Sequence, residues 1–371
     1  MRAAVMYDVD DIRIEERPLP QLESGDVLVR VGASGVCSGD LMPWYVRRKA
    51  PFVFGHEPAG TVVAFGGAEP VVAAGGVRLA LGARIFAHHH APCLHCAACG
   101  AGRFVHCATW RSTSLDPGAM AEYFRVPRLN LADTLVLPAA LSFANGSLVE
   151  PLACVVKSLR RAFPLAFERR GLVLADARAR AARSEATLRE QTLYVIGAGI
   201  MGLLHVAVGV ALGARVYASD FNVERRTAAE RLGAARVFTP PEARAGLGLE
   251  TGGRLADAVI CGPGTAIALE AAIGAAAPDG TVVMFTPLEP GERFAFAQSD
   301  AYFRDLKLVS SYSCGPRDTA EALRLIVDGV VSAARLGVQE FAFPAVERAY
   351  DAMRNAEVIK AIVCFDEIGA S

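Results

Sequence analysis

A cysteine, a histidine and two acids lie within residues 35–60 and are of the types that build a metal site. Cys37 and His56 carry the sulfur and nitrogen donors that zinc prefers in proteins. Asp40 and Glu57 are carboxylates that can orient such ligands from behind. A lone cysteine or histidine is usually a core residue, but the combination with two acids favours a metal. We expect the remaining ligands to come from other segments.

Four more cysteines follow within fifteen residues: Cys93, Cys96, Cys99 and Cys107. Four thiolates complete a tetrahedral zinc site and leave no position for a substrate, so the predicted role of this loop is structural. An iron–sulfur cluster is an alternative, and a set of unrelated reduced thiols is another. The same segment carries five histidines, which lack a ligand spacing and are interpreted as loop residues: His88, His89, His90, His95 and His106.

A glycine-rich turn predicts a dinucleotide site. Gly197, Gly199 and Gly202 form G-x-G-x-x-G, with Ile200 and Met201 inside the motif, between an apolar strand-like run and an apolar helix-like run. The first glycine permits the tight turn, the second lets the backbone approach a pyrophosphate, and the third lets helix meet strand. The phosphates are expected at the helix N-terminus, where free N–H groups and the helix dipole favour anions.

An acid stands where such a site binds the adenosine ribose. Asp220 ends the run R-V-Y-A-S-D, 18 residues after Gly202. Its carboxylate can accept hydrogen bonds from the ribose and would repel a 2′-phosphate, so NAD is favoured over NADP. Arg225 and Arg226 lie nearby and would weaken that preference if they faced the ribose, although helix-surface charges are the simpler interpretation.

Length and composition predict a two-domain α/β protein. The chain has 371 residues, of which 53% are hydrophobic and 21% charged, which argues against disorder. A net charge of −1 disfavours nucleic acid and anionic membranes as partners. Residues 193–214 carry no charged side chain, but five glycines interrupt them, so a buried strand and helix are favoured over a membrane span. A visible leader is lacking and the cysteines have metal-binding spacing, so we expect the cytoplasm.

The pattern of elements changes along the chain. Residues 1–155 carry short apolar runs typical of a small β-barrel or sandwich, including the cysteine loop 93–107. Residues 156–313 alternate strand-like and helix-like runs from 191 onward, which predicts a doubly wound parallel sheet. Residues 314–371 are expected to return to the first domain. An Arg- and Ala-rich stretch at about 160–190 is interpreted as a helical insertion, either solvent-exposed or packed on another subunit.

Together these motifs resemble the zinc-dependent medium-chain alcohol and polyol dehydrogenases, the group that contains sorbitol and threonine dehydrogenases. The resemblance covers nearly the whole chain and depends on motifs that occur in family order: G-V-C-S-G-D, G-H-E, the four-cysteine loop, Glu150-Pro151, and the glycine turn with Asp220. It implies a split chaperonin-10-like β-barrel catalytic domain and a Rossmann domain with the active site between them. It also implies two zinc ions per chain and a homodimer or homotetramer.

The resemblance assigns roles residue by residue. It makes Cys37 and His56 ligands of a catalytic zinc. Glu150 matches the acid that binds this zinc directly or through water, and Glu57 matches the acid that can exchange onto the metal. Asp40 matches the acid that orients the histidine.

One position departs from the family pattern. A serine or threonine usually stands two residues after the zinc cysteine, as the first hydroxyl of a proton relay. Here that position is Gly39, and the hydroxyl belongs to Ser38. The proton is therefore expected to leave through Ser38, another group or water.

These assignments predict hydride transfer between an alcohol and NAD, giving a ketone or aldehyde, with zinc stabilising the alkoxide. The substrate class is a polyol, a cyclitol or another secondary alcohol. Two alternatives stay open. One is a zinc-independent reductase of activated double bonds or quinones, and the other is a nucleotide-binding protein without turnover.

Overall fold

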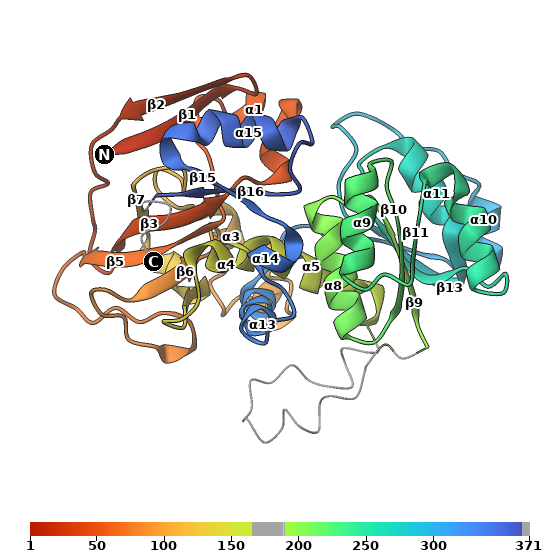
Figure 1. Ribbon diagram of the computed structural model, residues 1–371. Coiled ribbons are helices and arrows are strands. Elements are labelled where there is room, and N and C mark those ends of the chain that lie inside the picture. The colour runs from red at the N-terminus through yellow and green to blue at the C-terminus, as the bar shows by residue number, and fades with distance from the viewer. Residues whose placement is uncertain (165–187, 189, 366–371) are drawn as a thin grey trace. The chain divides into compact units, whose positions relative to one another are not determined.

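The computed structural model describes residues 1–164, 188 and 190–365. The chain divides into two compact units: unit 1 comprises Met1–Ala153 and Ser313–Ser371, and unit 2 comprises Cys154–Tyr312 (Figure 1). Most of the predicted Arg- and Ala-rich insertion lies outside the described residues. Within the described ranges, the helices are all too short or too polar to cross a membrane.

Unit 1 contains mainly β-strands and short helices. Its strands are β1 (Arg2–Asp8), β2 (Asp11–Glu16), β3 (Val27–Gly35), β4 (Phe52–Val53), β5 (Pro58–Phe65), β6 (Arg84–Ala87), β7 (Tyr123–Val126), β8 (Thr134–Val136), β15 (Gln339–Ala342) and β16 (Ala361–Cys364). Its α-helices are α1 (Pro43–Lys49), α2 (Ala97–Gly100), α3 (Ala108–Ser112), α4 (Phe143–Ser147), α13 (Pro316–Val327), α14 (Ala333–Leu336) and α15 (Val346–Arg354). Its 3₁₀ turns are η1 (Ser38–Leu41), η2 (Ala74–Gly76), η3 (Phe104–His106), η4 (Arg128–Asp133) and η5 (Phe343–Ala345). Helix α5 (Val149–Ala162) begins in unit 1.

Strand β3 organises unit 1. It pairs antiparallel with β5, β7 and β16, in a seven-stranded sheet whose path is β15-β16-β3-β5-β6-β8. Val27, Val29 and Val31 on β3 are fully buried, because branched apolar side chains fill the core against this sheet. Ile362 on β16 pairs with Gly35, so a strand from near the end of the described residues lies in the same sheet as β3. Strands β2, β1 and β4 form a second, three-stranded sheet.

Unit 2 is a parallel sheet covered by helices. Its strands are β9 (Thr192–Ile196), β10 (Arg215–Ser219), β11 (Arg236–Phe238), β12 (Ala256–Cys261), β13 (Ala276–Met284) and β14 (Lys307–Ser310). Its helices are α8 (Ile200–Ala211), α9 (Val223–Arg231), α10 (Pro240–Glu250), α11 (Ala266–Ala275) and α12 (Gln298–Phe303). The strand order β11-β10-β9-β12-β13-β14 confirms the predicted doubly wound sheet. Helices α8 and α9 cover one face, and α10 and α11 the other (Figure 1). The uncharged stretch 193–214 is strand β9 followed by helix α8.

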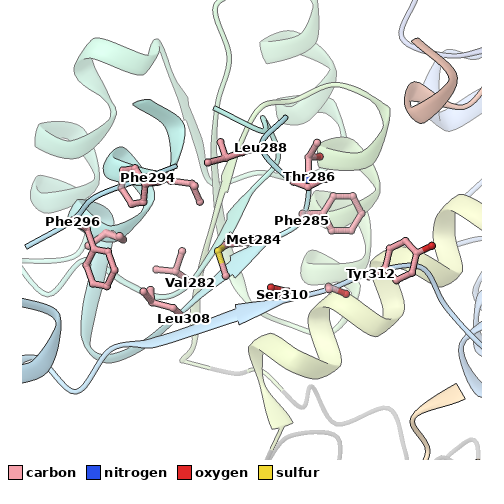
Figure 2. A pocket seen from close by; sticks show the side chains of 14 residues that line it. Val282, Met284, Phe285, Thr286, Leu288, Phe294, Phe296, Leu308, Ser310 and Tyr312 are labelled. Carbon is pink, nitrogen blue, oxygen red and sulfur yellow. The ribbon is translucent and has the colours of Figure 1, made fainter. Parts of the chain in front are cut away.

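Unit 2 also carries an apolar pocket of about 620 Å³ beside strands β13 and β14. Val282, Met284, Leu308 and Phe294 are among the side chains that line it (Figure 2). The predicted metal ligands and the glycine turn lie elsewhere, so this pocket is not the site that the motifs indicate.

Candidate functional site

The four cysteines of the loop 93–107 converge. The Sγ atom of Cys93 lies 3.6 Å from that of Cys107 and 3.9 Å from that of Cys99, and the Cys96–Cys99 separation is 3.5 Å. A tetrahedral zinc ion about 2.3 Å from each sulfur places the sulfurs about 3.8 Å apart, so the observed set fits zinc. Burial alone would raise the pKa of the Cys107 thiol, but hydrogen bonds from backbone N–H groups lower it to about 6. A thiolate is the form that binds a metal.

Three of the predicted catalytic ligands also lie together. Cys37 follows β3, and His56 and Glu57 precede β5. One potential ligand atom from each of these three side chains lies within 4.8 Å of the others. Because β3 and β5 are paired neighbours in the sheet, their ends bring residues 19 and 20 positions apart in sequence to one place. Asp40 Oδ2 lies 3.6 Å from His56 Nδ1, on the side from which it can orient the ring.

The electrostatics of this set favour a bound cation. Burial, followed by the charges of Glu57, Asp40 and Glu150, raises the pKa of the Cys37 thiol well above its ordinary value. Burial also raises the pKa of Asp40 and of Glu150. Burial by itself would lower the pKa of His56, because it disfavours the charged imidazolium. The neighbouring carboxylates, of which Asp40 has the largest effect, outweigh burial and raise the pKa. A divalent ion would relieve this excess of negative charge and stabilise the thiolate, so the donor set fits zinc.

Lys360 is a buried cation at this site that no sequence signal marked. Its Nζ lies 2.5 Å from Glu57 Oε2 and donates a hydrogen bond of 2.8 Å to the carbonyl of Val36. Both charged side chains are 1% exposed. A Cβ at Gly35 would lie 2.0 Å from Glu57 Oε2, so only glycine leaves room for the carboxylate there. Glu57 is therefore fixed from behind by an ion pair.

Glu150 lies in the first turn of α5, and its carboxylate groups with a different set. The set consists of Glu150, His88 and His89. Each side chain places one potential ligand atom within 4.8 Å of the other two. The His89 ring centre lies 4.8 Å from that of His56, so the two sets adjoin. His88 and His89, which the sequence suggested were loop residues, are thus part of the candidate site. The sequence did show adjacent histidines directly after a buried strand. Their spacing matches no known metal-ligand pattern, so this signal was not enough to assign them to the site.

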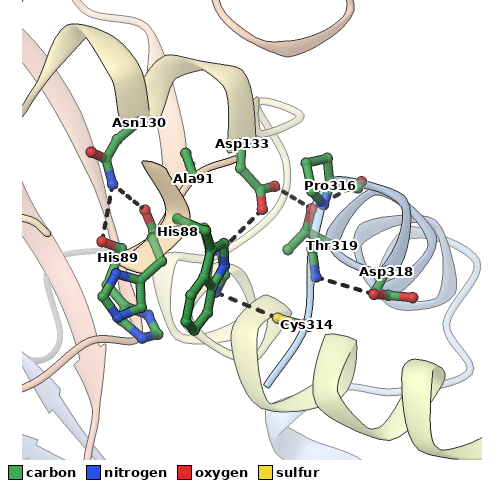
Figure 3. A network of polar contacts seen from close by, with 12 residues as sticks. His88, His89, Ala91, Asn130, Asp133, Cys314, Pro316, Asp318 and Thr319 are labelled. Atoms are coloured by element: carbon green, nitrogen blue, oxygen red, sulfur yellow. Dashed lines mark hydrogen bonds and ion pairs between the residues drawn. The ribbon is translucent and has the colours of Figure 1, made fainter. Parts of the chain in front are cut away.

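Behind His88 lies a fully buried polar network (Figure 3). His88 Nδ1 is 2.9 Å from Asp133 Oδ2, and His88 Nε2 is 3.5 Å from the Sγ of Cys314. Burial opposes protonation of His88, but the Asp133 charge outweighs it and raises the pKa of the imidazole. Asn130 Nδ2 donates to the carbonyls of His88 and His89, which fixes the backbone that carries both rings.

The departure from the relay pattern is visible in the turn after Cys37. Ser38 opens η1, and the Gly39 N–H donates a hydrogen bond of 3.3 Å to Cys37 Sγ. A Cβ at Gly39 would meet that sulfur at 3.5 Å, an ordinary contact. Lack of space therefore does not explain why position 39 carries a glycine. The role of Ser38 in proton release stays a prediction.

The glycine turn of unit 2 has the geometry that its motif requires. Gly197 has φ +86°, and a Cβ at Gly202 would lie 1.9 Å from the Gly197 carbonyl oxygen. Gly199 is the N-cap of α8, which begins at Ile200, and a Cβ at Gly199 would meet only the Arg225 guanidinium within 4 Å. The open approach to this N-terminus fits a pyrophosphate.

Asp220 is held beside the turn. Its Oδ2 accepts a hydrogen bond of 2.8 Å from the Ala198 N–H, and its Oδ1 accepts one of 2.8 Å from Asn222. Arg225 Nη1 lies 4.0 Å from Oδ2. Arg226 Nη1 donates a hydrogen bond of 3.0 Å to the Asp220 backbone carbonyl. The carboxylate is therefore oriented at the end of β10, with the Arg225 guanidinium close enough to moderate its charge.

Comparisons with known proteins agree with this geometry. Residues 23–136 match the alcohol dehydrogenase GroES-like domain, and residues 201–328 match the zinc-binding dehydrogenase domain. The "Probable D-xylulose reductase A" of Arthroderma otae is 28% identical over 97% of this chain and 96% of its own length. A protein named as a zinc-binding dehydrogenase from Sinorhizobium meliloti, solved with NADP bound, is 25% identical, covers 98% of this chain and 99% of its own, and has a TM-score of 0.78.

The 2R,3R-butanediol dehydrogenase of Bacillus subtilis, at 23% identity, shares the fold with a TM-score of 0.77 over 98% of this chain and 99% of its own. The predicted fold class, a chaperonin-10-like domain with a Rossmann domain, is confirmed by these matches. The chain therefore belongs to the zinc-dependent medium-chain alcohol and polyol dehydrogenases, which are oxidoreductases.

Proposed function

We propose that this protein transfers a hydride between a polyol or other secondary alcohol and NAD, using a zinc ion held by Cys37, His56 and Glu57. The observation that carries the proposal is the convergence of these three donors within 4.8 Å in a partly buried, negatively charged setting. The relatives named as xylulose reductases support a polyol as substrate.

Each residue has a physical task in this proposal. Cys37 and His56 would bind the ion, Asp40 would orient His56, and Lys360 would hold Glu57 in place. Bound zinc supplies a Lewis acid for the alcohol oxygen, and bound NAD accepts the hydride. Glu150, the ligand that the resemblance implied, remains the alternative to Glu57. Ser38 or water would carry the released proton outward.

The remaining expectations are also proposals. The four-cysteine loop would bind a second, structural zinc, for which the sulfur separations provide the support. We also propose a homodimer or homotetramer, which follows from the family resemblance. The cytoplasmic location is proposed from the metal-binding spacing of the cysteines.

The function is tested with a panel of polyols, secondary alcohols, amino alcohols and cyclitols, offered with NAD or NADP while reduced cofactor is followed by absorbance. We expect turnover of one of these classes that is lost on chelation and restored by zinc. Bound cofactor without turnover across the panel would contradict the dehydrogenase. Turnover that survives complete removal of metal would instead support a zinc-independent reductase.

The cofactor preference is predicted to depend on the charge of Asp220. Exchanging Asp220 for asparagine should shift the ratio of kcat/KM for NAD over NADP toward NADP by about 10²-fold, since a unit charge about 5 Å from a phosphate is worth about 3 kcal/mol at an effective dielectric constant near 20. Glu224→Gln, an exposed acid in the first turn of α9, is the matched control and should leave the ratio unchanged. An equal shift in both variants would show that Asp220 does not face the ribose.

A further inference from the structure

We propose that the proton released by the alcohol leaves through the Tyr45 hydroxyl and the Lys49 amine, a pair that takes the place of the relay hydroxyl missing at Gly39. The inference rests on the proposed function, because it concerns the alcohol that the enzyme would oxidise. Ser38 and water are then the competing routes for the proton, and the experiment below separates them from this pair.

Tyr45 and Lys49 lie on the helix next to the turn that lacks the hydroxyl. Helix α1 begins at Pro43, two residues after the end of η1, which carries Gly39, and the two elements pack together. Tyr45 and Lys49 are four residues apart, so they lie on the same face of α1. Lys49 Nζ donates a hydrogen bond to the Tyr45 hydroxyl and lies 3.9 Å from the centre of its ring. Tyr45 is half-buried and Lys49 is exposed, so a proton can pass from the hydroxyl to the amine and then to water.

The charge of Lys49 acts on groups of the candidate site that come from three neighbouring strands. It favours the charged form of Asp40, which follows β3, and opposes protonation of His56, which precedes β5. It also opposes protonation of His89 and His90, which follow β6. Lys49 therefore faces the ends of β3, β5 and β6, where the proposed ligands converge.

Lysine is a rare choice for a cation in this chain. Of its 38 lysine and arginine residues, only four are lysine: Lys49, Lys157, Lys307 and Lys360. A guanidinium stays protonated in proteins, whereas an ammonium can lose its proton when its hydration is reduced. Loss of hydration lowers the pKa of Lys49, and the charge of Arg48 lowers it too, against the opposing charges of Asp40 and Cys37. Lys49 is therefore a cation that can become a proton acceptor.

The proposed step balances without a further reactant. The alcohol O–H bond breaks and its proton passes to Tyr45 Oη, while the Tyr45 proton passes to the neutral Lys49 amine. The electron pair of the adjoining C–H bond leaves as hydride to NAD, and the carbonyl double bond of the ketone or aldehyde forms. The Lys49 ammonium then gives its proton to water, so one proton is released for each NAD reduced.

The test compares the full chain, loaded with zinc, with Tyr45→Phe, Lys49→Ala and Lys49→Arg. The kcat for an alcohol of the panel that the unmodified protein oxidises is followed against pH at saturating NAD. Each variant should lower kcat at neutral pH by about 10²-fold, the usual contribution of a positioned acid or base. The kcat of the unmodified protein should rise with pH as Lys49 loses its proton, and this rise should be lost in both Lys49 variants. Zinc content and NAD affinity should stay unchanged.

Lys49→Arg separates proton transfer from charge. An arginine keeps the positive charge but cannot accept a proton, so it should be as slow as Lys49→Ala. Methylamine added to Lys49→Ala should restore kcat in proportion to the concentration of free amine. Arg47→Ala is the matched control, since Arg47 is an exposed cation of the same helix that pairs with Asp8. It should neither lose kcat nor respond to methylamine.

Three kinetic outcomes would overturn the route while the proposed function stands. In the first, the Tyr45 and Lys49 variants keep the kcat and the pH profile of the unmodified protein. In the second, Lys49→Arg keeps full activity and Lys49→Ala loses it, so that Lys49 supplies only charge. In the third, Ser38→Ala loses kcat and Tyr45→Phe does not, which assigns the proton to Ser38. A lack of turnover by the unmodified protein across the panel is instead a failure of the proposed function itself.

A readout that needs no turnover uses the small number of lysines. After ¹³C-methylation of the full chain, the NMR signals of Lys49 and Lys307 are assigned from the signal that Lys49→Arg or Lys307→Arg lacks. Lys49 should titrate at lower pH than Lys307, an exposed lysine that pairs with Asp279. Titration of Lys49 at or above the pH at which Lys307 titrates would contradict its role as a proton acceptor.

Discussion

Replacing Cys37 by alanine is expected to lower kcat/KM by about 10³-fold or more while the fold persists. A Lewis-acidic ion contributes several kcal/mol of charge stabilisation in the transition state, and each 1.36 kcal/mol is a factor of ten in rate. Cys37 supplies the only thiolate donor of its ligand group, so its loss should release that ion. The measurement is steady-state kinetics together with zinc content and the circular dichroism spectrum.

Cys364→Ala is the control for this variant. Cys364 is also a partly exposed cysteine of unit 1, on β16, and lies outside the metal-ligand groups of the described residues. Its exchange should leave both turnover and zinc content close to those of the unmodified protein. A Cys37→Ala protein that retains full activity would remove the catalytic metal from the proposed mechanism.

Replacing Lys360 by methionine should destabilise unit 1 by about 3–5 kcal/mol, because removal of one partner leaves a buried charge uncompensated. The Lys360 ammonium contacts Glu57 Oε2 and the Val36 carbonyl, and both charged side chains are 1% exposed. Urea unfolding followed by tryptophan fluorescence measures this loss in unit 1, where both tryptophans of the chain, Trp44 and Trp110, are located.

Two further variants separate charge from packing. The Glu57→Gln/Lys360→Met double variant should recover most of the lost stability, because replacing both members of a buried ion pair is often nearly neutral. Arg348→Met removes an exposed cation of unit 1 that pairs with Glu357 and should cost less than about 1 kcal/mol. If Lys360→Met and Arg348→Met behaved alike, the Lys360–Glu57 pair would not be a determinant of stability.

Features that depend on residues close together in the sequence could be predicted from the sequence. The glycine turn and the acid at the end of the next strand lie within one strand–helix–strand unit, so their spacing already implied their geometry. The four cysteines are close enough in the chain for one loop to gather their sulfurs. The alternating strands and helices of unit 2 followed from local hydrophobic periodicity.

Tertiary structure alone decided which charged and polar groups lie behind these motifs. Lys360 is 303 residues from Glu57, and Cys314 is 226 residues from His88. Both contacts arise because the end of the chain returns to unit 1, where β16 pairs with β3 and α13 follows Cys314. Spacing along the chain carries no information about such contacts, since they depend on which surfaces pack together. The proximity of Glu150 to His88 and His89 was decided in the same way.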